Sequence, residues 1–195
     1  MSATTLNRPE VEWKTAEDLM AMPEDGIRRW IVDGLVKEIG MTQRNRFHSK
    51  TEATAATVLN IWAATKPKPR FTVLSGEAGI RLARNPDVSF GADVALIAPD
   101  VMAQQTDEST IIEGVPQLIV EITSPSDTLE TWFEKIKQYK KYGVPLTWIV
   151  NPYERTVGIH RPGQPPVVLN ETQDLICEPE LPGFRVPVIQ LFDDL

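Results

Sequence analysis

The sequence is short of cysteine and of long hydrophobic runs, and each shortage excludes a class of protein. Its 195 residues contain one cysteine, Cys177, so no internal disulfide can form, and a small buried side chain is the expected role of the thiol. No apolar run approaches the roughly 20 residues that span a bilayer. Residues 1–12 lack the charged and apolar regions of a secretory signal. We therefore expect a cytoplasmic protein with no membrane partner.

The sequence is also short of positive charge. Its 20 Lys and Arg residues face 27 Asp and Glu residues, which gives a net charge of −7. Proteins that bind nucleic acid usually carry a basic footprint, so this balance counts against tight, non-specific binding to DNA. It permits a site in which carboxylates hold divalent cations. Basic residues do gather locally, Arg28, Arg29 and Arg44 among them, but scattered surface charge explains this group as well as a binding face does.

The composition, 42% hydrophobic and 24% charged, is that of a globular protein able to bury a core. We expect a flexible N-terminus at residues 1–12 and a single domain at residues 13–195. Short apolar runs between turn residues predict strands, and apolar residues at helical spacing predict helices. The predicted helices are residues 15–20, 45–65 and 126–142, and the predicted strands are residues 29–32, 35–39, 71–74, 78–82, 93–97, 118–122, 146–150, 155–160 and 166–169.

This order of elements predicts an α+β fold. The strands at 93–97, 118–122 and 146–150 are expected side by side in a mixed sheet, because the last two are continuous apolar runs suited to the middle of a sheet. The helices at 45–65 and 126–142 should pack on it. Hairpins should lie at the periphery, and residues 181–192 are expected to be a loop with a terminal turn.

Two acidic residues stand where a buried strand would not tolerate an unpaired charge. Asp93 opens the run Asp-Val-Ala-Leu-Ile, and Glu121 lies near the end of Leu-Ile-Val-Glu-Ile. A buried carboxylate is costly unless it is paired, hydrogen-bonded or bound to metal. Two on neighbouring strands form a site for a hard cation such as Mg²⁺ or Mn²⁺, to which the backbone carbonyl of Ile122 could add an oxygen. Spacing alone leaves open that each acid is paired with a nearby Lys or Arg.

A longer segment resembles a known family. Residues 116–127 read Pro-Gln-Leu-Ile-Val-Glu-Ile-Thr-Ser-Pro-Ser-Asp, and Lys135, Tyr139, Gly143 with Val144, and Trp-Ile-Val-Asn-Pro at 148–152 follow. This order resembles the Uma2 family of restriction-endonuclease-like proteins in the PD-(D/E)XK nuclease superfamily, and weaker matches extend over roughly residues 31–192. The resemblance implies a restriction-endonuclease-like fold and a metal-dependent nuclease whose partner is nucleic acid, DNA above all. Because closed pairs are the commonest oligomers, we also expect a homodimer.

The resemblance assigns the two acids of the site. Asp93 matches the motif aspartate, although Gly91 and Ala92 stand where a proline usually precedes it. Asp87 follows Pro86 and so carries the literal Pro-Asp dipeptide, but we expect it in a turn. Glu121 matches the second acid. Two carboxylates so close together repel each other. We therefore expect at least one of them to have a raised pKa when no metal is bound.

The third superfamily residue, a lysine, would stand at Thr123 and is absent. In this family a lysine on the following helix takes its place, and Lys135 matches it, four residues before Tyr139 on one helix face. The resemblance implies that Lys135 orients the attacking water or stabilises the pentavalent phosphorus. The displaced lysine and the acidic net charge favour a second interpretation, in which the chain is a catalytically degenerate binding or scaffold module on the same fold.

Three further residues are candidates for accessory roles. His48 and Glu52 lie four apart near the start of a predicted helix and share a face. The superfamily often takes an extra ligand from a glutamate of its first helix, and His48 matches a recurrent family position. A local hydrogen bond at the helix start is the simpler interpretation of His48. Glu77 could lie near the site, but we expect it on a solvated strand edge.

Overall fold

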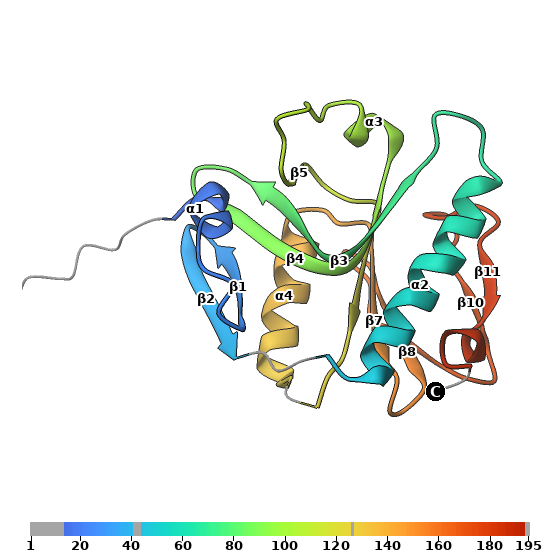
Figure 1. Cartoon of the computed structure of the whole chain (residues 1–195). Coiled ribbons are helices and arrows are strands. Elements are labelled where there is room, and N and C mark those ends of the chain that lie inside the picture. The colour runs from blue at the N-terminus through green and yellow to red at the C-terminus, as the bar shows by residue number, and fades with distance from the viewer. Residues whose placement is uncertain (1–13, 41–43, 126, 194–195) are drawn as a thin grey trace, which may run out of the picture.

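A computed structural model describes residues 14–40, 44–125 and 127–193. The predicted flexible segment at residues 1–12 lies outside them. In the described chain, nine strands form one mixed sheet that α2 and α4 flank, so the predicted α+β fold is confirmed (Figure 1). The helices are α1 (Ala16–Met20), α2 (Arg46–Ala64), α3 (Pro99–Met102), α4 (Leu129–Lys141) and the 3-10 helix η1 (Val188–Leu191). None of these is both long and apolar enough to cross a membrane.

The strands follow the order β2-β1-β4-β6-β7-β8-β9, with β3 beside β4 and β5 beside β3, and β10 and β11 form a second, two-stranded sheet. The β6–β7 and β3–β5 pairs are parallel and the other pairs are antiparallel. The strands are β1 (Ile27–Val32), β2 (Leu35–Gly40), β3 (Thr72–Ala83), β4 (Val88–Ile97), β5 (Ile112–Glu113), β6 (Leu118–Ile122), β7 (Leu146–Asn151), β8 (Thr156–His160), β9 (Val167–Asn170), β10 (Asp174–Ile176) and β11 (Arg185–Pro187).

Local signals explain where several elements begin and end. Thr15 caps α1 in a capping box with Asp18, which satisfies two amides of the first turn. Asp33 and Gly34 both have positive φ, as the tight turn between β1 and β2 requires. α4 begins at residue 129, later than the predicted residue 126. The Thr128 side chain caps it by accepting a hydrogen bond from the Thr131 N–H.

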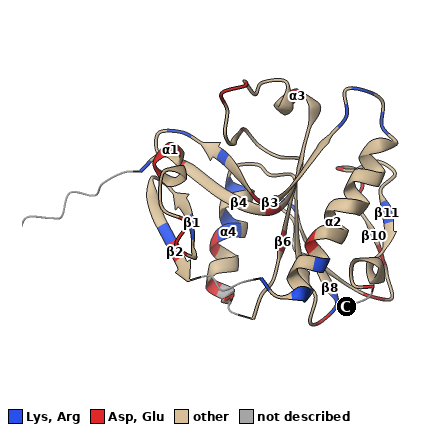
Figure 2. Ribbon diagram, in the orientation of Figure 1, with Lys and Arg blue, Asp and Glu red and all other residues tan. Residues whose placement is uncertain are grey.

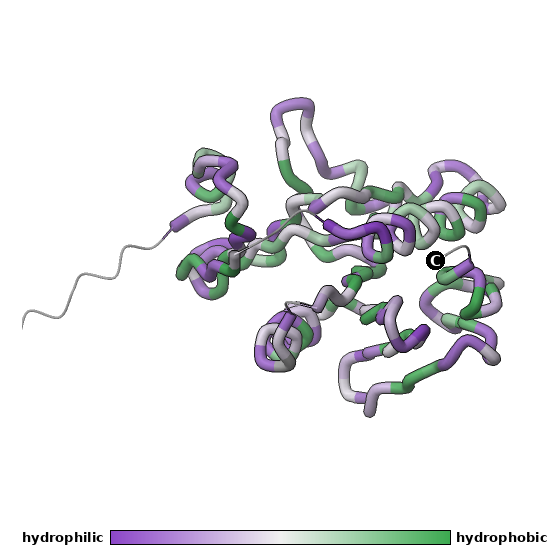
Figure 3. The backbone as a smooth tube through the Cα atoms, turned by 60° about the horizontal axis from the view of Figure 1, so that its bottom comes forward, coloured by the Kyte–Doolittle hydropathy of each residue, from purple (hydrophilic) through white to green (hydrophobic). Residues whose placement is uncertain are grey.

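The core has two parts, one on each face of the sheet. On one face α2 packs through Leu59 and Trp62 against alternate residues of β4 and β6. On the other face Tyr139 of α4 packs against Ala95 and Ile119, which point the opposite way. Figure 3 shows the hydrophobic stretches along the strands and the hydrophilic turns between them. Cys177 is buried, as predicted, and burial raises the pKa of its thiol to about 12.

Two predictions of secondary structure were wrong in detail. The strands expected at 71–74 and 78–82 are one strand, β3, with a bulge between Ser75 and Ala78 where Gly76 and Glu77 have positive φ. The tail at residues 181–192 contains β11, whose pairing with β10 the local sequence did not indicate. The hairpin of β8 and β9 lies at one edge of the main sheet, as predicted.

β4 is the strand at which the sheet divides. β3 pairs with it along nearly its whole length, β1 pairs with it at Ser89, and β6 pairs with it from Val94 to Leu96. A strand has two edges, so β1 and β6 share the edge that β3 leaves free, and they diverge on either side of residues 90–93. Asp93 lies in this fork, next to the first residue of β4 that pairs with β6.

Candidate functional site

Asp93 is fully buried at the fork, and a backbone amide, a histidine and two arginines, Arg28 and Arg44, contact its carboxylate. The Ile122 N–H donates a 2.7 Å hydrogen bond to Oδ2, and His48 Nε2 lies 3.3 Å from the same oxygen. Arg44 Nη1 donates to Oδ1 at 2.7 Å. A charge at 0% exposure is therefore satisfied by one backbone amide, by His48 in the first turn of α2 and by arginine side chains from outside that helix.

Glu121 is equally buried and points toward α4. Lys135 Nζ donates to Oε1 at 2.9 Å and to Oε2 at 2.8 Å, and the Tyr139 hydroxyl donates to Oε1. The Trp132 ring lies 5.4 Å from the Lys135 ammonium. In Figure 2 the acidic band on β6 lies between the charged bands of α4 and α2. The predicted approach of the α4 lysine to the second acid is thus present in the structure.

One guanidinium nitrogen joins the two acids. Arg28 Nη2, from β1, lies 3.3 Å from Glu121 Oε2 and 3.6 Å from Asp93 Oδ1. Asp93 and Glu121 lie on paired strands, and residues next to each of them, Val94 and Val120, are directly opposite. The predicted convergence of the two carboxylates on adjacent strands is therefore observed, with an arginine between them.

Glu77 belongs to this cluster, so the prediction of a solvated strand edge was wrong. Arg28 Nε and Nη2 each lie 3.1 Å from a Glu77 oxygen, and Arg44 forms a second ion pair with it. The β3 bulge turns Glu77 toward the fork, where Gly91 leaves room for it. A Cβ at Gly91 would lie 2.6 Å from Glu77 Oε2.

The accessory candidates His48 and Glu52 lie on the other side of the cluster. Glu52 Oε1 accepts a 2.8 Å hydrogen bond from the Gly76 N–H, which ties α2 to the bulge. Its second oxygen lies 3.7 Å from His48 Nδ1 and 3.8 Å from Arg44 Nη1. His48 contacts Asp93 directly, whereas Glu52 reaches it only through His48 and Arg44.

Comparison with known proteins decides the family. The Uma2 family model, described as "Putative restriction endonuclease", matches residues 16–189. The chain belongs to the Uma2 family. This Uma2 chain is also similar to a crystal structure of a putative nuclease belonging to DUF820 from Anabaena variabilis, with a TM-score of 0.74 and 19% identity over 91% of this chain and 97% of that chain. At that identity the similarity shows the fold alone. No curated protein matches the chain.

The electrostatics of Asp93 run opposite to the prediction of a raised pKa. Burial alone would raise it, but the His48 contact and the positive charges of Arg28 and Arg44 outweigh burial and hold the pKa of Asp93 below its ordinary value. The causes are the hydrogen bond from His48 and the charges of the two arginines, which the carboxylate-repulsion argument did not include.

On the α4 side of the cluster, burial is the largest influence on the pKa values. It lowers the pKa of Lys135 below the usual lysine value, and the nearby Glu121 carboxylate opposes this shift without cancelling it. Burial, followed by the charge of Glu121, raises the pKa of Tyr139 well above its usual value, so the phenol stays a hydrogen-bond donor.

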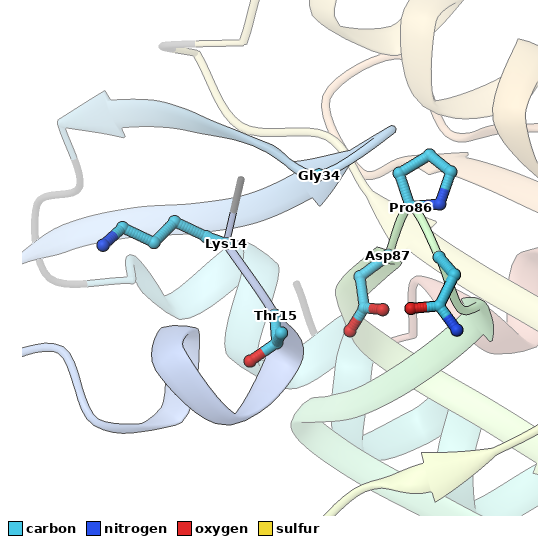
Figure 4. Close-up of a pocket in the computed structure, with 6 residues that line it drawn as sticks. Lys14, Thr15, Gly34, Pro86 and Asp87 are labelled. Carbon is cyan, nitrogen blue, oxygen red and sulfur yellow. The ribbon is translucent and has the colours of Figure 1, made fainter. Parts of the chain in front are cut away.

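Asp87, the literal Pro-Asp aspartate, lies elsewhere. Its Oδ2 accepts a 2.9 Å hydrogen bond from the Ala16 N–H and lies 3.2 Å from Arg81 Nε. Figure 4 shows its carboxylate directed toward the start of α1, beside a cavity of about 360 Å³. Asp87 therefore fastens α1 to the β3–β4 turn, and the prediction that it is not the site aspartate is consistent with this placement.

The donor chemistry of the site fits a hard divalent cation. Among the described residues, no group of three or more His, Cys, Asp or Glu side chains is arranged to hold a metal ion. Asp93 Oδ1 and Glu121 Oε2 nevertheless face one point, and Arg28 Nη2 already places positive charge there. Carboxylate oxygens are the ligands that Mg²⁺ and Mn²⁺ prefer. The Ile122 amide donates to the other Asp93 oxygen, Oδ2, and so fixes the orientation of this carboxylate.

Sequence reasoning missed Arg28 and Arg44 as members of the site. Both belong to the local group of basic residues, but a charge in a sequence does not identify its partner. One usable signal was present in the sequence, because two buried acids require counter-charges and Arg28 and Arg44 are among the few basic residues grouped near one another.

Proposed function

We propose that this Uma2 protein is a metal-dependent nuclease that hydrolyses phosphodiester bonds in DNA. The observation that carries the proposal is the convergence of Asp93 Oδ1 and Glu121 Oε2 on one point, with the Lys135 ammonium bound to Glu121 beside it. Two buried acids and a buried lysine at a sheet fork cost stability, and such costs are usual at functional sites. Family membership supports the same reaction class.

In this proposal Asp93, Glu121 and the backbone carbonyl of Ile122 would hold Mg²⁺ or Mn²⁺. A bound cation would neutralise negative charge on the phosphate and lower the pKa of a water. The chain's own groups orient the ligands. The Ile122 amide and His48 fix Asp93 Oδ2, and the Tyr139 hydroxyl fixes Glu121 Oε1.

Lys135 is the proposed catalytic cation of the chain. Its ammonium is held by both oxygens of Glu121 and walled by Trp132, so it keeps one position. A compact ammonium there can orient the attacking water or bind a non-bridging phosphate oxygen. Its attraction to the phosphate becomes stronger as negative charge develops in the transition state. His48 and Glu52 are proposed as accessory residues, His48 through Asp93 and Glu52 through Arg44.

A second function, a catalytically degenerate binding module, is favoured by one observation. Arg28, Arg44 and Lys135 already place positive charge against both acids, so the site can persist without metal. A module of this kind would keep its fold and its arginines but would not cut nucleic acid. The two functions differ in metal dependence, which an assay of cleavage resolves.

Supercoiled plasmid nicking with Mn²⁺ tests the proposed function. Wild-type protein is expected to convert supercoiled plasmid to open circles in a reaction that EDTA stops. Glu121→Gln should lose nicking, because an amide neither carries the charge nor binds the cation. Glu113→Gln is the matched control. Glu113 lies on β5 and pairs with Arg81 and Arg84, away from the two site acids, so this variant should cut normally. A wild-type protein that cuts neither DNA nor RNA with Mn²⁺ or Mg²⁺ would establish the binding module instead.

The protein is further proposed to act as a homodimer in the cytoplasm, because cutting both strands of a duplex at one place needs two sites. Light scattering at micromolar concentration should give a mass near twice 21.9 kDa. A monomeric mass would refute the dimer but would not contradict the proposed chemistry of a single site.

A further inference from the structure

The oxygens of the two acids have different partners. Asp93 Oδ2 is engaged by the Ile122 amide and His48, and Glu121 Oε1 is engaged by Lys135 and Tyr139. Both groups of partners can stay in place when a cation binds. The other two oxygens are also held by cations: Asp93 Oδ1 accepts from Arg44 at 2.7 Å and Glu121 Oε2 accepts from Lys135 at 2.8 Å. Arg28 Nη2 lies 3.6 Å from the first of these oxygens and 3.3 Å from the second, so it contacts both acids. The Arg28 nitrogen therefore lies where a cation shared by both carboxylates would lie.

We propose that Arg28 is a resident counter-cation of the site, and that a divalent metal ion binds to Asp93 and Glu121 by displacing its guanidinium. The proposal rests on the cation site of the proposed function and adds the residue that controls loading. An arginine keeps its charge at every physiological pH. The positive guanidinium and a metal ion would repel each other strongly at one point, so only one of them can be bound there at a time.

The surroundings of Arg28 allow such an exchange. Its Nε donates to Glu77 Oε2 at 3.1 Å, a bond that does not involve the two acids of the site. The guanidinium can therefore keep Glu77 as a partner while Nη2 withdraws. Gly91 leaves the space for that pair, because a Cβ there would lie 2.6 Å from the Glu77 carboxylate.

A cavity next to Arg28 supplies room for the displaced group. It measures about 270 Å³ and lies between α1 and the start of β4. Arg28, Glu77 and Gly91 form part of its wall, and Ser89 and Glu24 offer further polar contacts. The guanidinium thus has both a retained partner and an adjoining space, and neither requires the core to open.

Exchange has a consequence for affinity. The apo site is stabilised by Arg28, so a metal ion must compete with an intramolecular cation at high effective concentration. Removing that cation leaves Asp93 and Glu121 with less counter-charge, and the free site then attracts a dication more strongly. The resident arginine is expected to weaken metal binding and to stabilise the metal-free protein.

Isothermal titration with Mn²⁺ tests the exchange. Arg28→Gln is expected to bind Mn²⁺ about tenfold more tightly than wild type, and Arg28→Lys, whose ammonium cannot hold Glu77 and reach both acids, should show a smaller gain. Arg29→Gln is the matched control: it removes the same charge from the neighbouring position on β1, but Arg29 pairs with Asp25 and Glu38. Its affinity should equal that of wild type.

Thermal melting gives a second readout. Without metal, Arg28→Gln should melt below wild type, and Mn²⁺ should raise its midpoint by more than it raises that of wild type. If wild type binds Mn²⁺ and both Arg28 variants bind it no more tightly, the exchange is wrong and the nuclease proposal stands. If neither wild type nor any folded variant binds Mn²⁺, the cation site itself is wrong and the exchange falls with it. Arg28→Lys keeps the test decisive if Arg28→Gln does not fold.

Discussion

Lys135→Ala is expected to cut plasmid about 10²–10³-fold more slowly than wild type, the usual loss when one preorganised donor is removed from a transition-state site. Mn²⁺ affinity should not fall, because Lys135 contacts Glu121 and is not itself an oxygen ligand. The loss should therefore appear in cleavage and not in metal titration. Nicking rates at saturating Mn²⁺, together with titration of the same protein, measure both.

The control for this variant is Lys137→Ala. Lys137 is exposed on the same helix, so its removal changes the net charge equally and leaves the site intact. Breaking a buried ion pair costs about 3–5 kcal/mol, so circular dichroism must show that Lys135→Ala is folded at the assay temperature. A folded Lys135→Ala protein that cuts as fast as wild type would exclude the helix lysine as the catalytic cation.

Asp93→Asn is expected to lose both Mn²⁺ binding and cleavage, whereas Asp87→Asn should keep both. The amide at position 93 removes the charge that Arg28 and Arg44 face and one oxygen ligand of the proposed cation. Asp87 contacts Arg81 and the α1 backbone, so its replacement should instead lower the melting temperature. Titration, nicking and thermal melts on the two matched variants separate these effects.

The two aspartate variants test which sequence signal identifies the site residue. Asp87 has the literal Pro-Asp dipeptide and Asp93 does not. Metal binding that survives in Asp93→Asn and is lost in Asp87→Asn would contradict the assignment. Equal losses in both would point to a general loss of folding, which the melting curves detect.

The sequence predicted Asp93 and Glu121 because burial makes a charged residue in an apolar strand expensive. It predicted the β1–β2 hairpin and the start of α1 because Asp33-Gly34 and Thr15 act locally. Lys135 came from the family resemblance, since no local rule connects a lysine on a helix to an acid fourteen positions earlier. These signals were enough for the sheet order around β4 and β6.

The sequence did not predict the counter-charges. Arg28 reaches Glu121 across 93 positions and Arg44 reaches Asp93 across 49, and only the fork in the sheet brings them together. Glu77 enters the site because the β3 bulge turns it inward, and a bulge is set by the register of two strands and not by one. The sequence could not give the direction of the Asp93 pKa shift for the same reason, since that direction depends on His48 and the two arginines.

A crystal structure with Mn²⁺ tests the central claim, a cation site made by Asp93 and Glu121, most directly. The predicted result is an anomalous peak bound by Asp93 Oδ1 and Glu121 Oε2, with Arg28 Nη2 withdrawn and its Nε still bonded to Glu77. Saturating Mn²⁺ with no anomalous peak at the fork, and Arg28 still between the two carboxylates, would contradict it.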